Sequence, residues 1–181
     1  MKTRKKRKIQ RIVTNLLRQA EIDCPPVNVK KIAQLLEAEV YPKEFEDKDA
    51  ISGVLARDDQ HTIIVVNQTH SDVRQRFTIA HEIGHLMLHN YQDPYIDRTL
   101  PSMIRLRDDR SSLGEDSEEI EANAFASELL MPAFMIEESL GKIDFSKIYD
   151  YEDLITKLAK EYEVSTQAMT FRLINLGVIE G

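Results

Sequence analysis

The most constraining feature of the sequence is His81-Glu82-Ile83-Gly84-His85. It lies within residues 71–90, where the apolar residues have helical spacing. Histidines four residues apart lie about 6 Å apart on one face of a helix, so both rings can reach one metal ion. Glu82 is rotated away from that face, but its carboxylate can reach a water molecule at the metal and act as a general base. Since zinc sites use at least three protein ligands, the fold must bring a further ligand to this helix.

Gly84 stands between the two histidines of this motif. A glycine inside a helix costs about 1 kcal/mol relative to alanine. We therefore expect another segment, such as a second metal-binding helix, to pack closely against Gly84. The apolar flanks of the motif also favour a metal site over a surface helix with two unrelated histidines.

His89 is a third histidine on the same predicted helix, but it cannot share an ion with both of the others. His81 and His89 are separated by about 12 Å of helix. No histidine follows His89 in the sequence. We expect His89 to support the metal ligands, to face the substrate as a donor, or to be a helix-end cation.

A carboxylate on the next predicted helix is the remaining source of a ligand, and the candidates are Glu118, Glu119 and Glu121. The core stripe of that helix is expected at Ile120, Ala124, Ser127 and Leu130. Glu119 and Asn123 share a face beside this stripe, whereas the other two glutamates are expected to face solvent. Asn123 could bind a ligating histidine and fix its tautomer. For each glutamate, the alternative is an acid favoured by the helix dipole.

The charge of the chain is unevenly distributed. The formal net charge is −7, but residues 1–11 contain seven basic residues and no acid, so the remainder has 17 basic and 31 acidic residues. The acidic remainder argues against non-specific nucleic-acid binding as the main task. The basic leader could contact nucleic acid or an acidic partner, or be a solvated arm or the polar face of the first helix.

No apolar run approaches the roughly 20 residues that span a bilayer, and polar residues interrupt the stretch after the leader. A single cysteine, Cys24, excludes an internal disulfide. These observations predict a cytoplasmic protein with no membrane association.

The first half of the chain is expected to contain both helices and strands. Helical spacing is found over about residues 8–21 and again from Val29, with Asn28 as the expected N-cap. Strands are expected at Val40–Phe45, Ala50–Arg57 and His61–Asn67, the last two forming a β-hairpin around Asp58-Asp59-Gln60. The run Ile63-Ile64-Val65-Val66 suggests a central strand that is buried on both faces.

The second half is expected to be helical after a long connection over residues 91–115. We expect this connection to open and close access to the metal site. Helices are expected at Ser117–Met131, with a capping box at Asp116 and Glu119, at Tyr151–Tyr162, and at Thr166–Leu176, with Gly177 as the stop. We expect three units: a basic leader and helix over 1–24, a metal-binding domain over 25–140, and a helix-turn-helix-like subdomain over 141–181.

Two segments together resemble a known family. The segment Arg76–His85 reads RFTIAHEIGH, and it is followed by Glu119–Ala126, reading EIEANAFA, and by Leu129–Pro132, reading LLMP. These segments resemble the ImmA/IrrE family of metallopeptidases. The resemblance implies an α+β, zincin-like fold, in which a small, mostly antiparallel sheet packs on the active-site helix with the glutamate helix opposite. This chain departs from the family in a long loop between the two metal helices and in lacking room for a large C-terminal sensor domain.

The resemblance also implies roles for individual residues. His81, His85 and Glu119 are expected as metal ligands and Glu82 as the catalytic acid and base. Zn²⁺ is the expected ion, although Mn²⁺ or Fe²⁺ would also suit two histidines and a glutamate. His89, Tyr91 and Tyr95 are candidate donors to the oxyanion of the reaction.

The implied function is an endopeptidase of narrow specificity that cleaves a helix-turn-helix repressor in phage, mobile-element or stress regulation. The alternative is a non-catalytic regulator or protein-binding module with a structural or vestigial metal site. Direct DNA binding by the C-terminal helices is not favoured, because Arg172 is the single basic residue of the helix that would read DNA.

Overall fold

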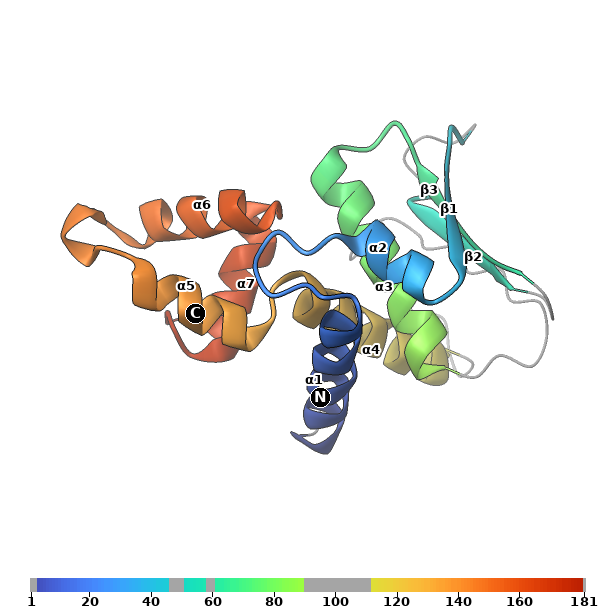
Figure 1. Ribbon diagram of the computed structural model, residues 1–181, viewed down its shortest axis with the longest axis horizontal. Helices are drawn as coiled ribbons and strands as arrows, with labels where there is room; N and C mark the ends of the chain where they lie inside the picture. Colours follow the sequence, from blue (N-terminus) through green and yellow to red (C-terminus); the bar gives the residue numbers. More distant parts are fainter. Residues whose placement is uncertain (1–2, 46–50, 58–60, 90–111, 181) are drawn as a thin grey trace.

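The computed structural model describes residues 3–45, 51–57, 61–89 and 112–180, and the side chains from residue 117 onward in the last range. The elements follow in the order α1 (Thr3–Gln19), α2 (Val29–Leu35), β1 (Ala38–Lys43), β2 (Gly53–Arg57), β3 (Thr62–Asn67), α3 (Asp72–Leu88), α4 (Ser112–Leu130), α5 (Ala133–Lys142), the 3₁₀ turn η1 (Phe145–Lys147), α6 (Tyr151–Tyr162) and α7 (Thr166–Leu176) (Figure 1).

The sheet has the strand order β1-β3-β2, with β3 in the centre as its run of branched apolar residues predicts. β2 and β3 pair antiparallel, which confirms the expected pairing of the hairpin strands, whose turn at 58–60 lies outside the described residues. β1 pairs with β3 in parallel from Ala38 opposite Thr62 to Lys43 opposite Asn67. The prediction of a mostly antiparallel sheet was therefore wrong: the sheet is mixed. β2 occupies one edge of β3, so β1 pairs with the other edge, and the chain runs along that edge in the same direction as β3.

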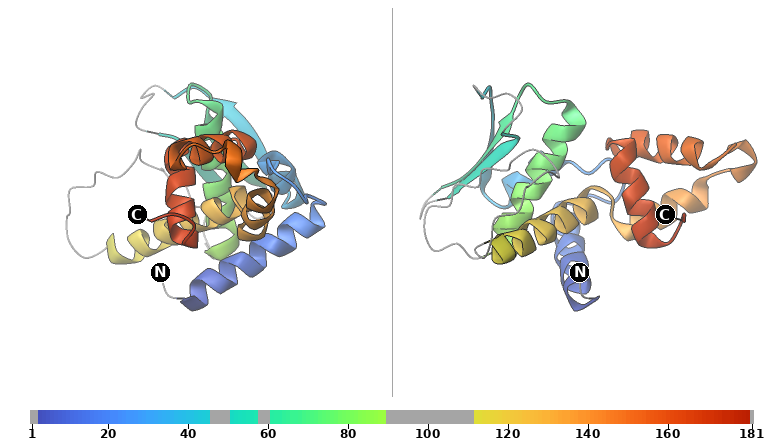
Figure 2. Two further views of the ribbon diagram at one scale, coloured as in Figure 1. Left: turned by 90° about the vertical axis from the view of Figure 1, so that its left-hand side faces the viewer. Right: turned by 180° about the vertical axis from the view of Figure 1, so that it is seen from behind.

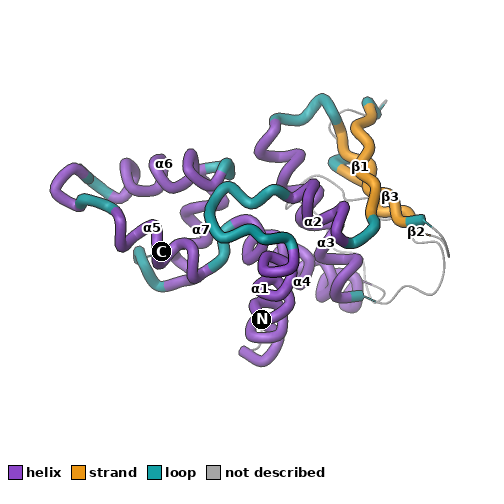
Figure 3. Tube along the Cα trace, in the orientation of Figure 1, coloured by secondary structure: helices purple, strands orange, loops and turns teal. Residues whose placement is uncertain are grey.

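Helix α3 packs on the sheet, and α4 crosses α3 on the side away from the strands (Figures 1 and 3). The contact between these helices is close because Gly84 has no side chain. A Cβ atom there would lie 3.1 Å from the Cα of Ala122 and 3.2 Å from the Cβ of Phe125. The expectation that a second helix packs against Gly84 is confirmed.

The two N-terminal helices complete the body around α3 and α4. α1 packs on α4 through its buried apolar face, and α2 packs on α3 and β1. Asn28 caps α2, as expected, by accepting a hydrogen bond from the amide of Lys31 at 3.1 Å. α1 begins at Thr3 rather than near residue 8, so the basic leader is part of the helix.

The C-terminal helices α5, α6 and α7 form a group beside α3 and α4 (Figure 2). α6 and α7 have the predicted bounds because Asp150 and Ser165 cap their N-termini. Glu163 ends α6 with a φ of 51°, and Gly177 ends α7 with a φ of 72°. α5 was not predicted, because Pro132 was interpreted only as the end of the preceding helix, whereas it also begins the next one.

Helix α4 differs from its prediction in two respects. It begins at Ser112, so Asp116 and Glu119 lie inside the helix and do not form a capping box at its start. Ile120 is 56% exposed, so the expected core stripe was wrong in part. The buried face is formed instead by Ala122, Phe125, Ala126, Leu129 and Leu130, together with the acidic Glu128.

None of the helices in the described part of the chain combines the length and apolar composition that crossing a bilayer would require.

Candidate metal centre

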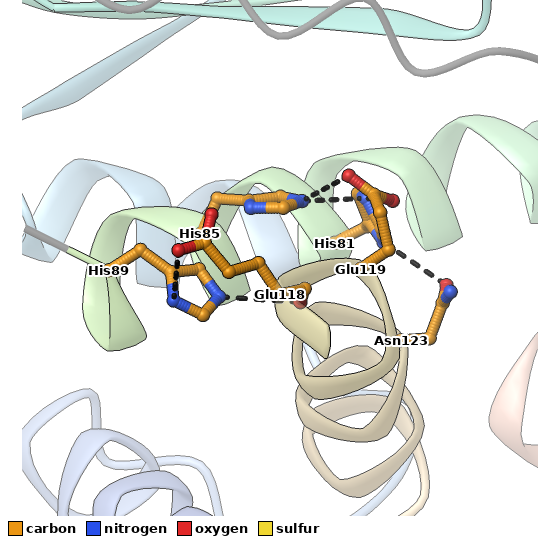
Figure 4. Close-up of polar contacts among 6 residues, drawn as sticks. All are labelled: His81, His85, His89, Glu118, Glu119 and Asn123. Carbon is orange, nitrogen blue, oxygen red and sulfur yellow. Dashed lines mark hydrogen bonds and ion pairs between the residues drawn. The ribbon is translucent and has the colours of Figure 1, made fainter. Parts of the chain in front are cut away.

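Three side chains from two helices converge at the crossing of α3 and α4. His81 and His85 are buried on α3, and Glu119 reaches them from α4 (Figure 4). The Nε2 atoms of the two histidines lie 3.0 Å apart. Each of these nitrogens lies 3.3 Å from a carboxylate oxygen of Glu119, Oε2 for His81 and Oε1 for His85. Of the three candidate glutamates, Glu119 is the one whose carboxylate contacts both histidines.

The donor set and its spacing fit a small divalent ion. Two imidazole nitrogens and a carboxylate are the ligands of many zinc sites, at about 2.0–2.2 Å from the ion. Ligands at that distance in tetrahedral array lie about 3.3–3.6 Å from one another. The separations between the donor atoms of His81, His85 and Glu119 are 3.0–3.3 Å. The side chains therefore hold a spacing close to that of three tetrahedral ligands.

The environment of Glu119 keeps its carboxyl group ionised. Burial alone would raise its pKa, but hydrogen bonds from the rings of His81 and His85 outweigh burial and hold the pKa of Glu119 well below its usual range. An ionised carboxylate beside two imidazoles provides the negative charge that a divalent cation requires.

Asn123 supports the site from one turn further along α4. Its Oδ1 atom lies 3.1 Å from Nδ1 of His81 (Figure 4). A carboxamide oxygen can only accept a hydrogen bond, so this contact favours the proton of His81 on Nδ1. With a proton on Nδ1, Nε2 would be the nitrogen that gives up its own proton and offers a lone pair to an ion bound between the three side chains.

Glu82 lies on the side of α3 that faces the sheet and is fully buried. Its surroundings are set by Gly53 at the start of β2. A Cβ atom at Gly53 would lie 3.4 Å from Oε1 of Glu82 and 2.4 Å from Cγ2 of Thr78. The strand backbone therefore approaches the carboxylate as closely as the absence of a side chain permits.

His89 follows the last residue of α3 and lies beside α4. Its Nε2 is 3.3 Å from the backbone oxygen of Glu118, and its Nδ1 is 4.0 Å from the carboxylate of the same residue. Burial lowers the pKa of His89, with Glu118 opposing that effect. Glu118 thus faces His89 rather than only solvent. Of the predicted oxyanion donors, Tyr91 and Tyr95 lie outside the described residues.

Several residues around the site were missed by sequence reasoning. Glu121, expected to face solvent, forms an ion pair with Lys5 of α1. Arg76, on the first half of α3, donates hydrogen bonds to the backbone oxygens of Val27, Tyr162 and Glu163, at 3.0, 3.4 and 3.2 Å. An arginine within an apolar helix pattern is the one signal in the sequence that could have indicated a buried anchor.

Comparison with known proteins bears on the family of this chain. A family model described as peptidase family M78, IrrE N-terminal-like domain, matches residues 44–174. The chain belongs to this family. The family expected from the two sequence segments is thus confirmed, and the match includes both helices of the metal centre as well as α6 and most of α7.

Two relatives of this M78 protein come from different biological settings. It is 29% identical over 113 residues to the uncharacterized immunity region protein 2 of Bacillus phage phi105, a match that covers 61% of this chain and 63% of the phage protein. It is 32% identical over 125 residues to the radiation response metalloprotease IrrE of Deinococcus radiodurans, covering 65% of this chain and 32% of IrrE. The matches thus span less than two thirds of either relative.

Proposed function

We propose that this protein is a metal-dependent endopeptidase. The observation that carries the proposal is the convergence of His81, His85 and Glu119, together with the fully buried carboxylate of Glu82 on the same helix as the two histidines. A structural metal site has no use for a general base next to its ligands, whereas hydrolysis requires one. Membership of a peptidase family supports the same reaction class.

The proposed metal ligands are His81, His85 and Glu119, with Zn²⁺ as the expected ion and Mn²⁺ or Fe²⁺ as alternatives. An ion at this position supplies Lewis acidity, which polarises a carbonyl group and makes water a stronger acid. Asn123 orients His81 for this task through Nδ1.

Glu82 is the proposed acid and base of the reaction. Its carboxylate accepts a proton from the water that attacks the scissile carbonyl carbon. It then donates that proton to the amide nitrogen as the peptide bond breaks. Tyr91 and Tyr95 remain the candidate donors to the oxyanion, while the ring of His89 is already engaged by Glu118.

The proposed substrate is a cytoplasmic helix-turn-helix repressor, cleaved with narrow specificity in phage, mobile-element or stress regulation. The names of the two relatives, an immunity region protein and a radiation response metalloprotease, support a regulatory setting. The alternative of a DNA-binding regulator acting through α7 is not favoured. Arg172, the single basic residue of that helix, is buried and binds Glu128 at 2.6 Å.

The test is metal analysis of the purified protein together with co-incubation with the repressor encoded beside its gene. The wild-type protein should contain one divalent ion per chain and cut the repressor at one place. Glu82→Gln should keep the ion and lose cleavage by at least about 100-fold, the lower end of what a general base contributes. Glu137→Gln, an exposed change on α5, is the matched control and should cleave like the wild type. Cleavage by Glu82→Gln at the wild-type rate would remove Glu82 from the mechanism.

A further inference from the structure

Helix α1 presents a line of cations on its outer face, which we call the basic stripe: Arg4, Arg7, Lys8, Arg11 and Arg18. Arg7 and Lys8 follow Arg4 by three and four residues, and Arg11 follows them by four and three. Arg18 comes seven residues later. All of these spacings return to the same side of a helix. The stripe extends over about 21 Å at 1.5 Å per residue. All five side chains are exposed, and α1 lies at the outside of the molecule (Figure 2).

The basic stripe has no counter-charge within the part of the chain that the structure describes. None of its five side chains forms an ion pair with a described acidic residue, and α1 itself contains no acid. Lys5 differs, because it lies nearer the packed face and binds Glu121. Helices α3, α5 and α6, in contrast, carry both signs, as in the Lys142–Glu138 pair of α5. Like charges one turn apart lower the stability of a helix. A bound anion would reduce this repulsion between the side chains of the stripe.

The packing of α1 excludes insertion of this helix into a membrane. A basic amphipathic helix binds a lipid surface by burying its apolar face in the bilayer. In this protein that face is already used, because Ile9, Val13, Leu16 and Leu17 are buried against the body. Only the charged side remains available to a partner.

The composition of the stripe favours nucleic acid over an acidic protein. The core of a protein–protein interface is apolar and aromatic, but none of the exposed large hydrophobic residues lies on α1. The neighbours of the stripe are instead the neutral polar residues Gln10, Thr14 and Asn15. Arginine, lysine, threonine, glutamine and asparagine are the side chains that contact phosphate groups. Four of the five cations are arginines, whose planar guanidinium groups can bind phosphate through two hydrogen bonds.

We propose that the basic stripe binds the phosphate backbone of duplex nucleic acid without reading its sequence. The chain after position 11 contains 17 basic and 31 acidic residues. This net negative charge repels a polyanion, so the molecule would approach nucleic acid with the basic stripe facing it. The stripe would hold the peptidase on DNA that carries a DNA-binding substrate. This use rests on the proposed function, whereas the binding itself does not.

Binding is measured by fluorescence anisotropy of a labelled 30-base-pair duplex of arbitrary sequence with the intact protein, without a cleavage assay. Five phosphate contacts predict a slope of about −4 to −5 for log K against log salt concentration. Arg7→Glu/Arg11→Glu should weaken binding by at least about 100-fold at 50 mM salt and lower the slope by about 2. Lys30→Glu/Lys31→Glu on α2 changes the net charge equally at exposed positions and should bind like the wild type.

Three results would overturn the proposal. The first is no binding of the duplex by the wild type at 50 mM salt. The second is an equal loss of affinity in the α1 and α2 double variants, which would show that only net charge matters. The third is tighter binding of poly-glutamate than of the duplex, lost in Arg7→Glu/Arg11→Glu, which would assign the stripe to an acidic protein. Because cleavage is not measured, a failure to bind the duplex would not argue against the proposed peptidase activity. A failure to cleave the repressor would likewise not argue against binding by the basic stripe.

Discussion

At the residue scale, Asn123 illustrates how an exposed side chain can serve a buried site. Its Oδ1 lies 3.1 Å from Nδ1 of His81, and this contact orients the ring without taking part in the core. Asn123→Ala should raise the dissociation constant for Zn²⁺ by about 10- to 100-fold, the usual effect of removing such a partner. Asn123→Asp, which keeps an acceptor, should bind at least as tightly as the wild type. Competition against a chromophoric chelator measures both, and an unchanged affinity for Asn123→Ala would refute the role.

Gly53 allows β2 to approach Glu82, the proposed general base. A methyl group at Gly53 would lie 2.4 Å from Cγ2 of Thr78, so Gly53→Ala must displace either the strand or the helix next to Glu82. We expect a loss of stability of about 1–3 kcal/mol by chemical denaturation, together with reduced cleavage at retained metal content.

A second variant separates this steric effect from a general loss of the fold. Thr78→Ser removes Cγ2 but keeps the hydroxyl group that donates to the backbone oxygen of Arg74 at 3.0 Å. In the Gly53→Ala background it should restore most of the lost stability and cleavage. If Thr78→Ser restores neither stability nor cleavage in this background, the proposed contact is contradicted.

The sequence predicts the residues within one helix better than those that meet across helices. His81, Glu82 and His85 follow from helical spacing alone. Glu119 shares its face with Asn123 by the same spacing, but its choice over the neighbouring glutamates depended on the family resemblance. Ile120 was assigned to the core because it is apolar, whereas the buried face of α4 is determined by its contacts with α3 and α1, which local spacing does not reveal.

At the scale of elements, the contact between α3 and α4 sets the geometry of the candidate metal centre, because each helix carries some of the proposed ligands. Gly84→Ala would place a methyl group 3.1 Å from the backbone of Ala122. We expect a net destabilisation of about 1–2 kcal/mol, since crowding outweighs the gain in helix propensity, and weaker binding of Zn²⁺.

The matched control for Gly84 is Gly141 on α5. A Cβ atom there meets nothing within 4 Å, so Gly141→Ala should stabilise the protein by up to about 1 kcal/mol and leave metal binding unchanged. Thermal unfolding and metal titration of both variants provide the comparison. Equal effects on metal affinity would show that the closeness of α3 and α4 is not important for the site.

Elements with strong caps were predicted most accurately. The bounds of α6 and α7 follow from Asp150, Ser165 and Gly177, which act locally. The parallel pairing of β1 with β3 depends on the direction in which the chain returns to the sheet between these strands, and local sequence contains no such information. The start of α1 was placed too late because its first turn contains charges but no apolar residue.

At the scale of the whole molecule, two arginines connect the C-terminal helices to α3 and α4. Arg172 of α7 binds Glu128 of α4 at 2.6 Å and donates to the backbone oxygen of Met131 at 2.8 Å. Arg76 of α3 contacts the turn between α6 and α7 through Glu163. The division into domains at 25–140 and 141–181 remains a prediction, but these contacts indicate that the two parts stabilise each other.

Removing one partner of the buried pair should be more harmful than removing both. Arg172→Met leaves the carboxylate of Glu128 buried without its cation and should cost about 3 kcal/mol or more in denaturant unfolding. Glu128→Met/Arg172→Met removes both charges and should be less destabilised than the single variant. If the double variant loses as much as the sum of the two single variants, the ion pair does not connect α4 and α7 energetically.

The central claim is that α3 and α4 together hold one divalent ion between His81, His85 and Glu119. The most direct measurement is a crystal structure of the zinc-loaded protein with anomalous data collected on both sides of the zinc absorption edge. We predict a single peak at about 2.0–2.2 Å from Nε2 of both histidines and from a carboxylate oxygen of Glu119. A peak elsewhere, or one without Glu119 among its ligands, would contradict the account.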